Sequence, residues 1–458
     1  MIENDAFKLL LINLFHLNPD DIANILCTTF NKMMVLVVTL TDKHQACPYC
    51  GFTAPKIKEY VTKEITHSAL TTQKCIIKYR ARRYKCKCCG KTFYEFNPFV
   101  FKSQKISILT VHNILKDLKD FNETFTSVAR RYHVSPTSVS TIFDNHVDIG
   151  RNPLPEIINF DEVYAFKSEK SKYVCVLLDF KKQIPVDVLP NRKKEYLLNY
   201  FQKIPLEERK KVKYACSDMY EVYRDVVHKV FPSCCMLLDY FHLSQDFHRK
   251  MNEVRIKVMK GYKDNKASDE YYLLKKFNWL LFKNPEDEDK HGRLFDVERE
   301  RKYNSHFKSY MNYYDLRKKL LEINNDLTIC YSLKLELVDF YSKSTVDNAK
   351  ENLENLICSC IDTNIDEMIA FSNNLINWKQ EIINSFTIVG TEYKVEADKG
   401  QVVVCNKKVN NAIIENRNKI IKCIKNNANG YTNWSRFRNR VMYVLDPNAT
   451  FSLEPREK

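Results

Sequence analysis

The stretch from residue 156 to 238 constrains the fold most, because strand-like and helix-like patterns alternate there in a definite order. Three apolar, β-branched segments are typical of strands: "IINFDEVYAF", "KYVCVLLDF" and "QIPVDVLP". A helical period follows in "RKKEYLLNYFQKIP", and a strand pattern in "KVKYACSD". A second helix, "MYEVYRDVVHKVFP", leads to a last strand, "CCMLLDYFH". The sequence therefore predicts three strands in a meander, a helix, a strand, a helix and a strand.

This order is that of a ribonuclease H-like fold, in which the first and fourth strands lie side by side. Asp161 interrupts the first strand, where an unpaired carboxylate is costly to bury, and Asp218 ends the fourth. We therefore expect both carboxylates in one site, and an N-cap role for Asp218 is compatible with this. Such oxygen ligands suit two Mg²⁺ or Mn²⁺ ions. Two ions roughly 3.5–4 Å apart can activate an attacking oxygen and stabilise a leaving one.

The third carboxylate is expected from a later helix. Glu415, in "NNAIIENRNKIIKCIK", is the candidate, since Lys419 and Lys422 follow on the same helix face and can hold phosphates. An exposed salt bridge is the alternative, and the commoner, role for such a glutamate. Asp239 and His242, in "LLDYFHLSQ", form a second polar cluster that orients the site or the DNA, or makes only a structural hydrogen bond.

Two C-x2-C pairs, each followed by glycine, lie nearer the N-terminus: Cys47 with Cys50, and Cys86 with Cys89. Each turn can deliver two thiolates, and four thiolates hold one structural zinc ion. The strand-like sequence between the pairs predicts a zinc ribbon, although the gap of about 35 residues exceeds the usual spacing. Cys75 and Cys88 are expected to be bystanders. Four unrelated free cysteines are the alternative.

Residues 104–147 change to a helical period. We expect one helix over residues 127–132, a turn at "HVS", and a second helix over residues 136–144 that Ser135 caps. This is the arrangement of a helix-turn-helix, whose second helix reads the major groove while basic residues hold phosphate. A plain helical linker is the alternative. The polar residues expected to face DNA are Arg130, Arg131, Thr137, Ser138, Ser140 and Thr141.

The amino-acid composition limits the kinds of binding partner that the protein can have. The chain has 72 lysines and arginines against 57 acids, a net charge of +15. This balance favours a nucleic-acid partner, with codon bias as the alternative cause. The 16 cysteines are scattered, as in a protein with reduced thiols, and the 8 glycines provide no phosphate-binding loop. No apolar run approaches the roughly 18 residues of a membrane span, and "MIENDAF" is not a signal peptide. We therefore expect no membrane partner and a cytoplasmic protein.

The order of these features resembles the ISL-three family of bacterial insertion-sequence transposases. The similarity runs from "CPYCG" through "DEVYAFK", "SDMYEVY" and "DYFH" to "FRNRVMY", nearly the whole chain. It implies a zinc ribbon and a helix-turn-helix before a DDE domain, with a helical insertion between the second Asp and the Glu. By this resemblance Asp161, Asp218 and Glu415 are catalytic and bind the metal ions, and Asp239 matches a further family Asp. The crowded "CKCC" is one departure.

The sequence thus predicts a multidomain α+β protein with a ribonuclease H-like α/β core that a mostly helical insertion interrupts. The expected parts are the zinc ribbon (1–98), the helix-turn-helix (99–150), the first part of the core (151–245), the insertion (246–404), the helical end of the core (405–447) and a tail (448–458).

The expected function is that of a DNA transposase. It would bind the terminal inverted repeats of its element in double-stranded DNA and catalyse metal-dependent cleavage and strand transfer. We expect a homo-oligomer once the protein is assembled on DNA, associated with the bacterial nucleoid. Two alternatives stay open: a non-catalytic DNA-binding regulator, which the acidic trio disfavours, and a nuclease that cuts without strand transfer.

Overall fold

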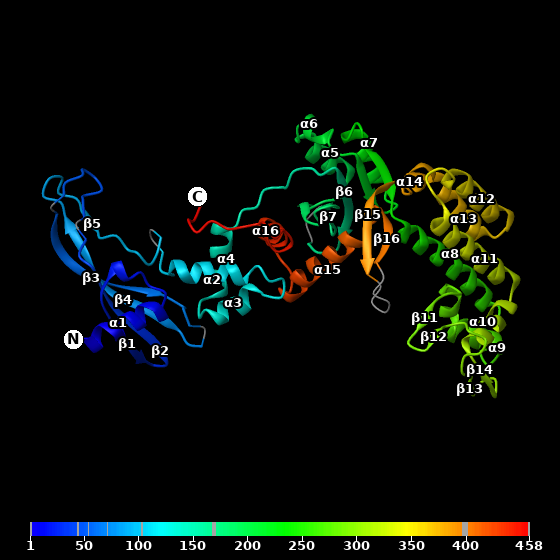
Figure 1. Ribbon diagram of the computed structural model, residues 1–458, viewed down its shortest axis with the longest axis horizontal. Helices are drawn as coiled ribbons and strands as arrows, with labels where there is room; N and C mark the ends of the chain where they lie inside the picture. Colours follow the sequence, from blue (N-terminus) through cyan, green and yellow to red (C-terminus); the bar gives the residue numbers. More distant parts are fainter. Residues whose placement is uncertain are drawn as a thin grey trace.

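The computed structural model describes residues 2–43, 45–53, 55–70, 72–101, 104–166, 171–395 and 402–456. The molecule is elongated, with an N-terminal sheet at one end, a mixed sheet in the middle and a helical lobe at the other end (Figure 1). Among the described residues, no helix combines the length and the apolar character that crossing a membrane requires.

Five strands form the N-terminal sheet, in the order β1-β2-β4-β3 with β5 paired to β4. Helix α1, Ile2–Leu14, covers one face of this sheet, and its Leu11 and Ile12 pack against Ile25 and Leu36. The strands are β1 (Ile22–Phe30), β2 (Met33–Leu40), β3 (Lys56–Thr66), β4 (Cys75–Lys85) and β5 (Thr92–Tyr94).

Strand β1 is not among the strands that the sequence analysis placed. The turn between β1 and β2 consists of Asn31 and Lys32, which have φ angles of 49° and 59°. Two positive φ angles are typical of the tight hairpin turn that matches the twist of its strands. The usual signal for this turn is a glycine at the second position, and here a lysine occupies it.

Three helices follow the N-terminal sheet and share one apolar core: α2 (Ile108–Asp117), α3 (Phe125–Arg131) and α4 (Pro136–His146). The side chain of Ser135 accepts a hydrogen bond from the amide of Ser138 at 3.0 Å, so the expected N-cap is confirmed. The turn between α3 and α4 contains His133 with a φ angle of 53°. The two helices that were expected here are confirmed, with ends within about two residues of those expected.

The central sheet has the order β10-β9-β6-β7-β8. Strand β6 pairs in parallel with β9 and antiparallel with β7, so the expected neighbourhood of the first and fourth strands is confirmed. Strand β10 is parallel to β9, and β8 is antiparallel to β7. The strands are β6 (Ile157–Val163), β7 (Val174–Asp179), β8 (Pro185–Leu189), β9 (Tyr214–Ser217) and β10 (Cys235–Leu238).

Helices cover both faces of this sheet. On one face Ile158 and Phe160 pack against α5 (Lys194–Gln202) and α7 (Glu221–Val230), and the short α6 (Leu206–Arg209) lies nearby. On the other face Val174 and Val176 pack against α15 (Ala412–Asn427) and α16 (Trp434–Leu445). Because side chains alternate along a strand, the odd-numbered residues of β6, which include Asp161, face α15.

Helix α8, Tyr240–Lys260, begins directly after β10 and carries the chain into the helical lobe (Figure 1). The other helices of the lobe are α9 (Asp269–Lys276), α10 (Tyr313–Glu322), α11 (Asn325–Lys343), α12 (Ala349–Asp362), α13 (Asp366–Asn377) and α14 (Lys379–Asn384). Two short strand pairs lie between α9 and α10 in the sequence: β11 (Glu288–Asp289) with β12 (Gly292–Arg293), and β13 (Lys302–Asn304) with β14 (Ser309–Met311). A mostly helical composition, as expected for the insertion, is confirmed for this lobe.

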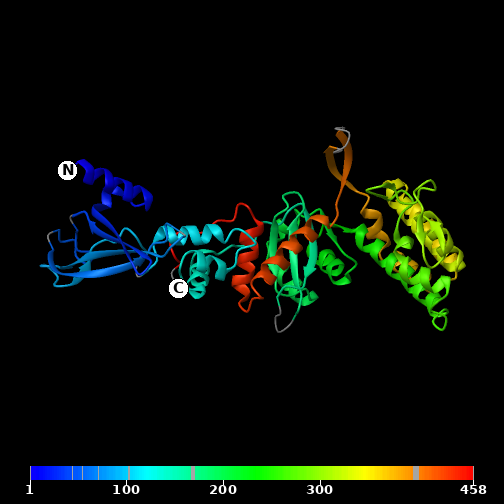
Figure 2. The same ribbon diagram turned by 90° about the horizontal axis from the view of Figure 1, so that it is seen from below.

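The hairpin of β15 (Ile388–Val395) and β16 (Val402–Lys408) was not expected, because the sequence analysis treated this region as the end of a helical insertion. Figure 2 shows the hairpin, in orange, projecting from the body of the molecule. Tyr393 is 71% exposed and Val404 is 60% exposed, so neither strand has the buried face that produces a clear apolar alternation.

Candidate active site and metal centres

The carboxylates of Asp161, Glu162 and Asp218 meet at one end of β6 and β9. One oxygen from each of them lies within 4.8 Å of the others. Asp161 is held opposite Val176 of β7 by the register of the sheet, and Asp218 directly follows β9. The structure therefore brings together the two aspartates that the sequence analysis paired. It adds Glu162, to which the sequence analysis gave no role.

Burial sets the electrostatics of this group. Asp161 is 8% exposed, and its burial raises the pKa of its carboxyl to about 7. The amide of Glu162, which donates to Asp161 Oδ1 at 2.7 Å, lowers that pKa, whereas the charges of Asp218 and Glu162 raise it. Burial also raises the pKa of Asp218, whose Oδ1 accepts no hydrogen bond from any described residue. Crowded, buried oxygen atoms with a free lone pair fit a hard divalent cation.

Arg192 limits the negative charge at one side of the group. Its guanidinium forms an ion pair with Glu162, which also accepts a hydrogen bond from the Tyr223 hydroxyl at 3.2 Å. The charge of Arg192 also lowers the pKa of Asp218, after a larger effect of His242 in the same direction. Among the described residues, Glu162 is therefore the carboxylate of this group that forms an ion pair with a cationic side chain.

Helix α15 supplies the remaining expected carboxylate and an amide. Asn418 Nδ2 donates to Asp161 Oδ2 at 2.7 Å, and Glu415 lies one turn earlier on α15. Glu415 belongs to a second group, with Asp239 and His242, in which the ligand atoms are again within 4.8 Å of one another. The expected trio of Asp161, Asp218 and Glu415 is thus divided between two adjoining groups.

The two groups adjoin at His242. Its charge lowers the pKa of Asp161, Glu162 and Asp218 in the first group and the pKa of Asp239 in the second. The Nε2 atom of His242 lies 3.8 Å from Asp239 Oδ2 and 3.7 Å from Glu415 Oε1. Asp239 and His242 therefore lie inside the candidate active site rather than in a separate polar cluster.

Asparagines fix the start of α15 against the sheet. The backbone amide of Asn411 donates to Asp239 Oδ1 at 3.2 Å, and its side chain donates to the carbonyl of Phe160 at 3.3 Å. Asn159, from β6, donates to Asn411 Oδ1 at 2.7 Å. The sequence analysis missed these residues. The signal available was the spacing of Asn411 and Asn418 around Glu415, which places all three on one side of a helix.

Lys419 and Lys422 are both exposed on α15, as expected. Neither forms an ion pair with a carboxylate of the described chain, and Lys419 Nζ lies 3.3 Å from Asn416 Oδ1. Their charges are therefore available to phosphate groups that approach the site from solvent.

Arg130 and Arg131 differ, although they are adjacent in α3. Arg130 is exposed and lines a cavity of about 470 Å³ together with Arg436 and the loop before α16. Arg131 forms ion pairs with Glu123 and Asp117, and hydrogen bonds to these two carboxylates raise its pKa. Arg131 therefore stabilises the contact between α2 and α3. Arg131, whose side chain is still 37% exposed, is thus paired within the protein, and contact of either arginine with DNA stays a prediction.

The hydroxyl groups of α4 also differ in their contacts. Thr137 and Thr141 are exposed one turn apart. Ser138 Oγ lies 2.8 Å from the Oγ of the capping Ser135, and Ser140 Oγ donates to the carbonyl of Thr137 at 3.0 Å. The two threonine hydroxyls are therefore the freer pair for contacts outside the protein.

The four cysteines of the C-x2-C pairs converge beside the hairpin of β3 and β4. Their sulfur atoms all lie within 4.8 Å of one another, with 3.7 Å between Cys47 and Cys89 and 3.5 Å between Cys50 and Cys86. Four Zn–S bonds of about 2.3 Å in a tetrahedron place the sulfur atoms about 3.8 Å apart. The amides of Cys89 and Cys88, in that order of effect, lower the pKa of Cys86 to about 7. The cluster therefore fits a zinc ion.

Each cysteine turn depends on the glycine that follows it. Gly51 and Gly90 both have a φ angle of 73°, which residues other than glycine rarely adopt. Their amides donate to the carbonyls of Cys47 and Cys86 at 2.8 and 3.1 Å and close the two turns. Cys75 is buried in the sheet core and Cys88 lies outside the cluster, as expected.

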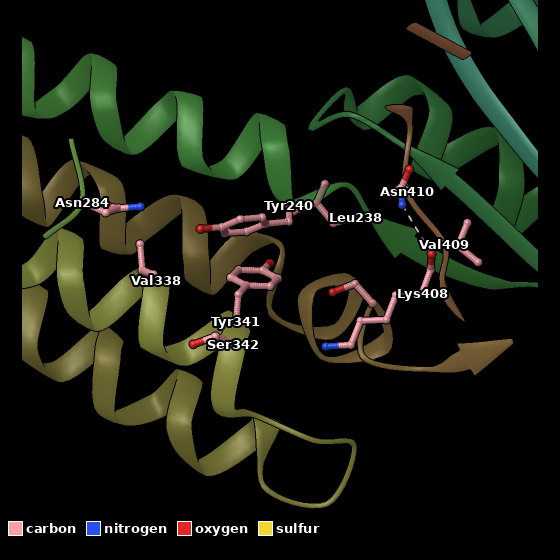
Figure 3. A pocket seen from close by; sticks show the side chains of 10 residues that line it. Leu238, Tyr240, Asn284, Val338, Tyr341, Ser342, Lys408, Val409 and Asn410 are labelled. Atoms are coloured by element: carbon pink, nitrogen blue, oxygen red, sulfur yellow. Dashed lines mark hydrogen bonds between the residues drawn. The ribbon is translucent and has the colours of Figure 1, made fainter. Parts of the chain in front are cut away.

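A cavity of about 520 Å³ lies between the start of α8, helix α11 and the segment that precedes α15 (Figure 3). Tyr240 and Tyr341 line it with their ring centroids 3.8 Å apart, and Lys408 and Asn410 close its other side. Its lining includes no carboxylate. The cavity therefore contributes space beside the site, while the ligand atoms lie at the end of the sheet.

Comparison with known proteins gives the family. The model of the ISL-three family of DDE transposases, described as "Transposase", matches residues 158–397, more than half of the chain. The chain belongs to this family. It is also 19% identical, over 411 residues, to the transposase for insertion sequence element IS1001 of Bordetella parapertussis. That alignment covers 89% of this chain and 91% of the relative. Glu415 lies beyond the matched residues, so its assignment depends on the geometry.

As a member of this family, the protein is an enzyme that transposes DNA, and DNA is its partner. The family also uses divalent metal ions. The carboxylate groups at the end of the central sheet and the cysteine cluster are donor sets of the kind that holds such ions.

Replacing Cys86 with serine should remove the zinc ion and unfold the region around the two cysteine turns, because metal binding supplies much of the folding free energy of such a site. Elemental analysis of the purified protein should give one zinc ion per wild-type chain and a loss in the Cys86→Ser variant. Cys88→Ser is the matched control, since Cys88 is an exposed neighbour outside the cluster. Wild-type protein without zinc, or equal zinc loss in both variants, would contradict the assignment.

Replacing Asp161 with asparagine should stabilise the protein at pH 8 when no divalent ion is added. The pKa of Asp161 is about 7 in the folded protein, against roughly 3.9 in an unfolded chain. The folded protein therefore binds the Asp161 proton more tightly than the unfolded chain does. The favourable effect of this on the free energy of unfolding is fully present below pH 4 and is lost as the pH rises to 7. Melting temperatures should favour the variant by a few degrees at pH 8 and by less at pH 5.

The control for this pH dependence is Glu156→Gln. Hydrogen bonds from Lys181 and Lys213 lower the pKa of Glu156 to about 2, so its effect on stability has the opposite sign. Chelators are omitted from these measurements, so that the cysteine cluster keeps its metal ion. A melting temperature of Asp161→Asn at or below that of wild type at pH 8 would show that the buried charge is compensated within the protein.

Proposed function

We propose that this protein is a DDE transposase that binds the terminal inverted repeats of its element, cuts the element's ends and joins them to target DNA. The observation that carries the proposal is the convergence of Asp161, Asp218 and Glu415 at one end of the central sheet. These residues come from three elements that are far apart in sequence, and each has oxygen atoms beside those of another carboxylate.

We further propose that the central domain is ribonuclease H-like. The sheet order β10-β9-β6-β7-β8, with one antiparallel side and one parallel side, supports this assignment. The tight pair of α3 and α4, with a polar outer face on α4, supports a helix-turn-helix. The cysteine cluster on the β3–β4 hairpin supports a zinc ribbon. In this proposal both small domains bind the element's ends, and the protein forms a homo-oligomer on DNA.

The residues of the site have distinct roles in this proposal. Asp161 and Asp218 bind metal ions through oxygen atoms that the protein leaves partly free. Asn418 and the amide of Glu162 each donate to one oxygen of Asp161, so the carboxylate is oriented while each oxygen keeps a lone pair. Lys419 and Lys422 hold DNA phosphates beside the site. Bound Mg²⁺ or Mn²⁺ ions would polarise the scissile phosphodiester and stabilise the charge that develops during hydrolysis and strand transfer.

Asp161→Asn and Asp218→Asn should each reduce cleavage and joining by about a hundredfold or more, because charge stabilisation at the reacting phosphate is removed. Binding of the element's ends should stay near the wild-type level, since other domains provide it. The assay uses labelled end DNA, Mg²⁺ and a target plasmid. Asp225→Asn is the control, because Asp225 is a surface carboxylate paired with Lys194 on the far face of the sheet.

This assay also separates the alternatives. Wild-type cleavage rates in either site variant would contradict the metal-site assignment. Cleavage by the wild-type protein without joined products would favour a nuclease that lacks strand transfer. End binding without any cleavage would favour a DNA-binding regulator.

Replacing Thr137 and Thr141 with alanine should reduce the preference for element ends over scrambled DNA by about 1–3 kcal/mol for each base that a threonine recognises. Ser140→Ala is the matched control, because the Ser140 hydroxyl already donates to a backbone carbonyl. Arg130→Ala should weaken binding to all sequences and reduce its salt dependence. Competition titrations at two salt concentrations measure both effects. Full sequence preference in the double variant would place recognition elsewhere, for example in the cysteine domain.

A further inference from the structure

One nitrogen donor lies among the carboxylates of the candidate active site. His242 is in the first turn of α8, three residues after Asp239, and its Nε2 atom lies between Asp239 Oδ2 and Glu415 Oε1. The two distances, 3.8 and 3.7 Å, are too long for hydrogen bonds. Two atoms that each bind one ion at about 2.0–2.2 Å lie roughly 3–4 Å apart. The spacing is therefore that of ligands around a common ion.

A second observation concerns the hydrogen bonds of Asp239, which is 3% exposed. Its Oδ1 accepts a hydrogen bond from the amide of Asn411, but no described residue donates to its Oδ2. His242 Nε2 is likewise buried, with no hydrogen bond to any described residue. A buried polar atom without a partner is costly, and a cation shared by these two atoms would remove that cost.

A direct ion pair between a protonated His242 and its two neighbours explains these distances less well. Charge-assisted N–H···O contacts are usually about 2.7–2.9 Å long, and the contacts here exceed that range by nearly 1 Å. The helix start of α8 and the amide of Asn411 fix Asp239, whereas α15 fixes Glu415. The three side chains thus come from two anchored elements, the start of α8 and α15, and leave a gap between their ligand atoms.

We propose that Asp239, His242 and Glu415 together hold one divalent ion through one imidazole nitrogen and two carboxylate oxygens. Asp161, Glu162 and Asp218 then form an all-oxygen site for a second ion. The proposal rests on the proposed function, whose reaction needs divalent ions, and it specifies which side chains hold each one. The acidic trio expected from the sequence is thereby shared between two sites of different chemistry.

The mixed donor set has a consequence for the choice of metal ion. Mg²⁺ is a hard ion that binds through oxygen and keeps several waters, whereas imidazole suits first-row transition ions. We therefore expect Mn²⁺ to bind the site of His242 more tightly than Mg²⁺. The all-oxygen site should discriminate less between the two ions.

The test measures Mn²⁺ binding to the full-length, zinc-loaded protein without DNA. Electron spin echo modulation detects a ¹⁴N nucleus bound to Mn²⁺, and the decrease of the free Mn²⁺ resonance gives the affinity. Wild-type protein should show ¹⁴N modulation, and His242→Gln should lose it together with about tenfold or more in affinity at one site. His228→Gln, a change at an exposed histidine of α7, should leave both measurements unchanged.

Two further variants keep the outcome interpretable. Asp239→Asn should weaken the same Mn²⁺ site, and Asp218→Asn should weaken the other site while the ¹⁴N modulation persists. Melting curves show whether each variant is folded. Bound Mn²⁺ without ¹⁴N modulation, modulation that survives in His242→Gln, or no Mn²⁺ binding at millimolar concentration would each overturn the proposal.

The experiments distinguish a failure of this inference from a failure of the proposed function. If Asp161→Asn abolishes cleavage while Mn²⁺ shows no nitrogen ligand, the transposase site stands and the role of His242 is wrong. If Asp161→Asn cleaves DNA at the wild-type rate, the proposed active site itself is wrong, whatever the ligands of Mn²⁺.

Discussion

The contact between α15 and β6 is the constraint on which the candidate active site depends. The chain leaves the central sheet after Leu238 and returns at Asn411, having formed the whole helical lobe in between. On its return, Asn411 contacts β6 and Asp239, and Asn418 donates to Asp161. These amides are polar, buried and directional, so they fix the position of α15 more narrowly than apolar packing alone. Glu415 reaches the site because the residues on either side of it are anchored.

Helix α16 extends this constraint to the DNA-binding helices that we propose. Arg440, 1% exposed, donates to the carbonyls of Asp120 and Glu123, while Arg438 contacts Asp187 of β8. One helix therefore packs on the central sheet and on the loop between α2 and α3. Because α16 contacts both this loop and the central sheet, the fold fixes the distance between α4 and the carboxylates of the candidate active site. If α4 is the recognition helix that we propose, this connection fixes its position relative to the candidate active site.

The sequence was sufficient to predict which residues lie together where the order of strands, helices and turns determines which segments are neighbours. Asp161 and Asp218 could be paired because the strand and helix pattern predicts which strands are neighbours, and the cysteines could be grouped because each turn brings two of them together. The sequence could not predict that the carboxylates form two groups. This arrangement depends on how α8 and α15, which are separated by a long insertion, pack against each other. The partners of Arg131 lie in α2 and in the loop before α3, so its neutralisation depends on packing between helices. The hairpin of β15 and β16 was missed because both of its faces are exposed.

The site gathers more negative charge than the protein alone neutralises. Burial raises the pKa of Asp161, Asp218 and Asp239, and among the described residues Arg192 is the arginine paired with a carboxylate of either group. Ionising these groups without a cation opposes folding, so the sheet and its two helical covers must supply the stability that holds them together. The packing of β6 and β7 provides it, since nearly every residue of β6 and all of β7 are buried. This rigid core keeps the ligand atoms in place until bound cations balance their negative charge.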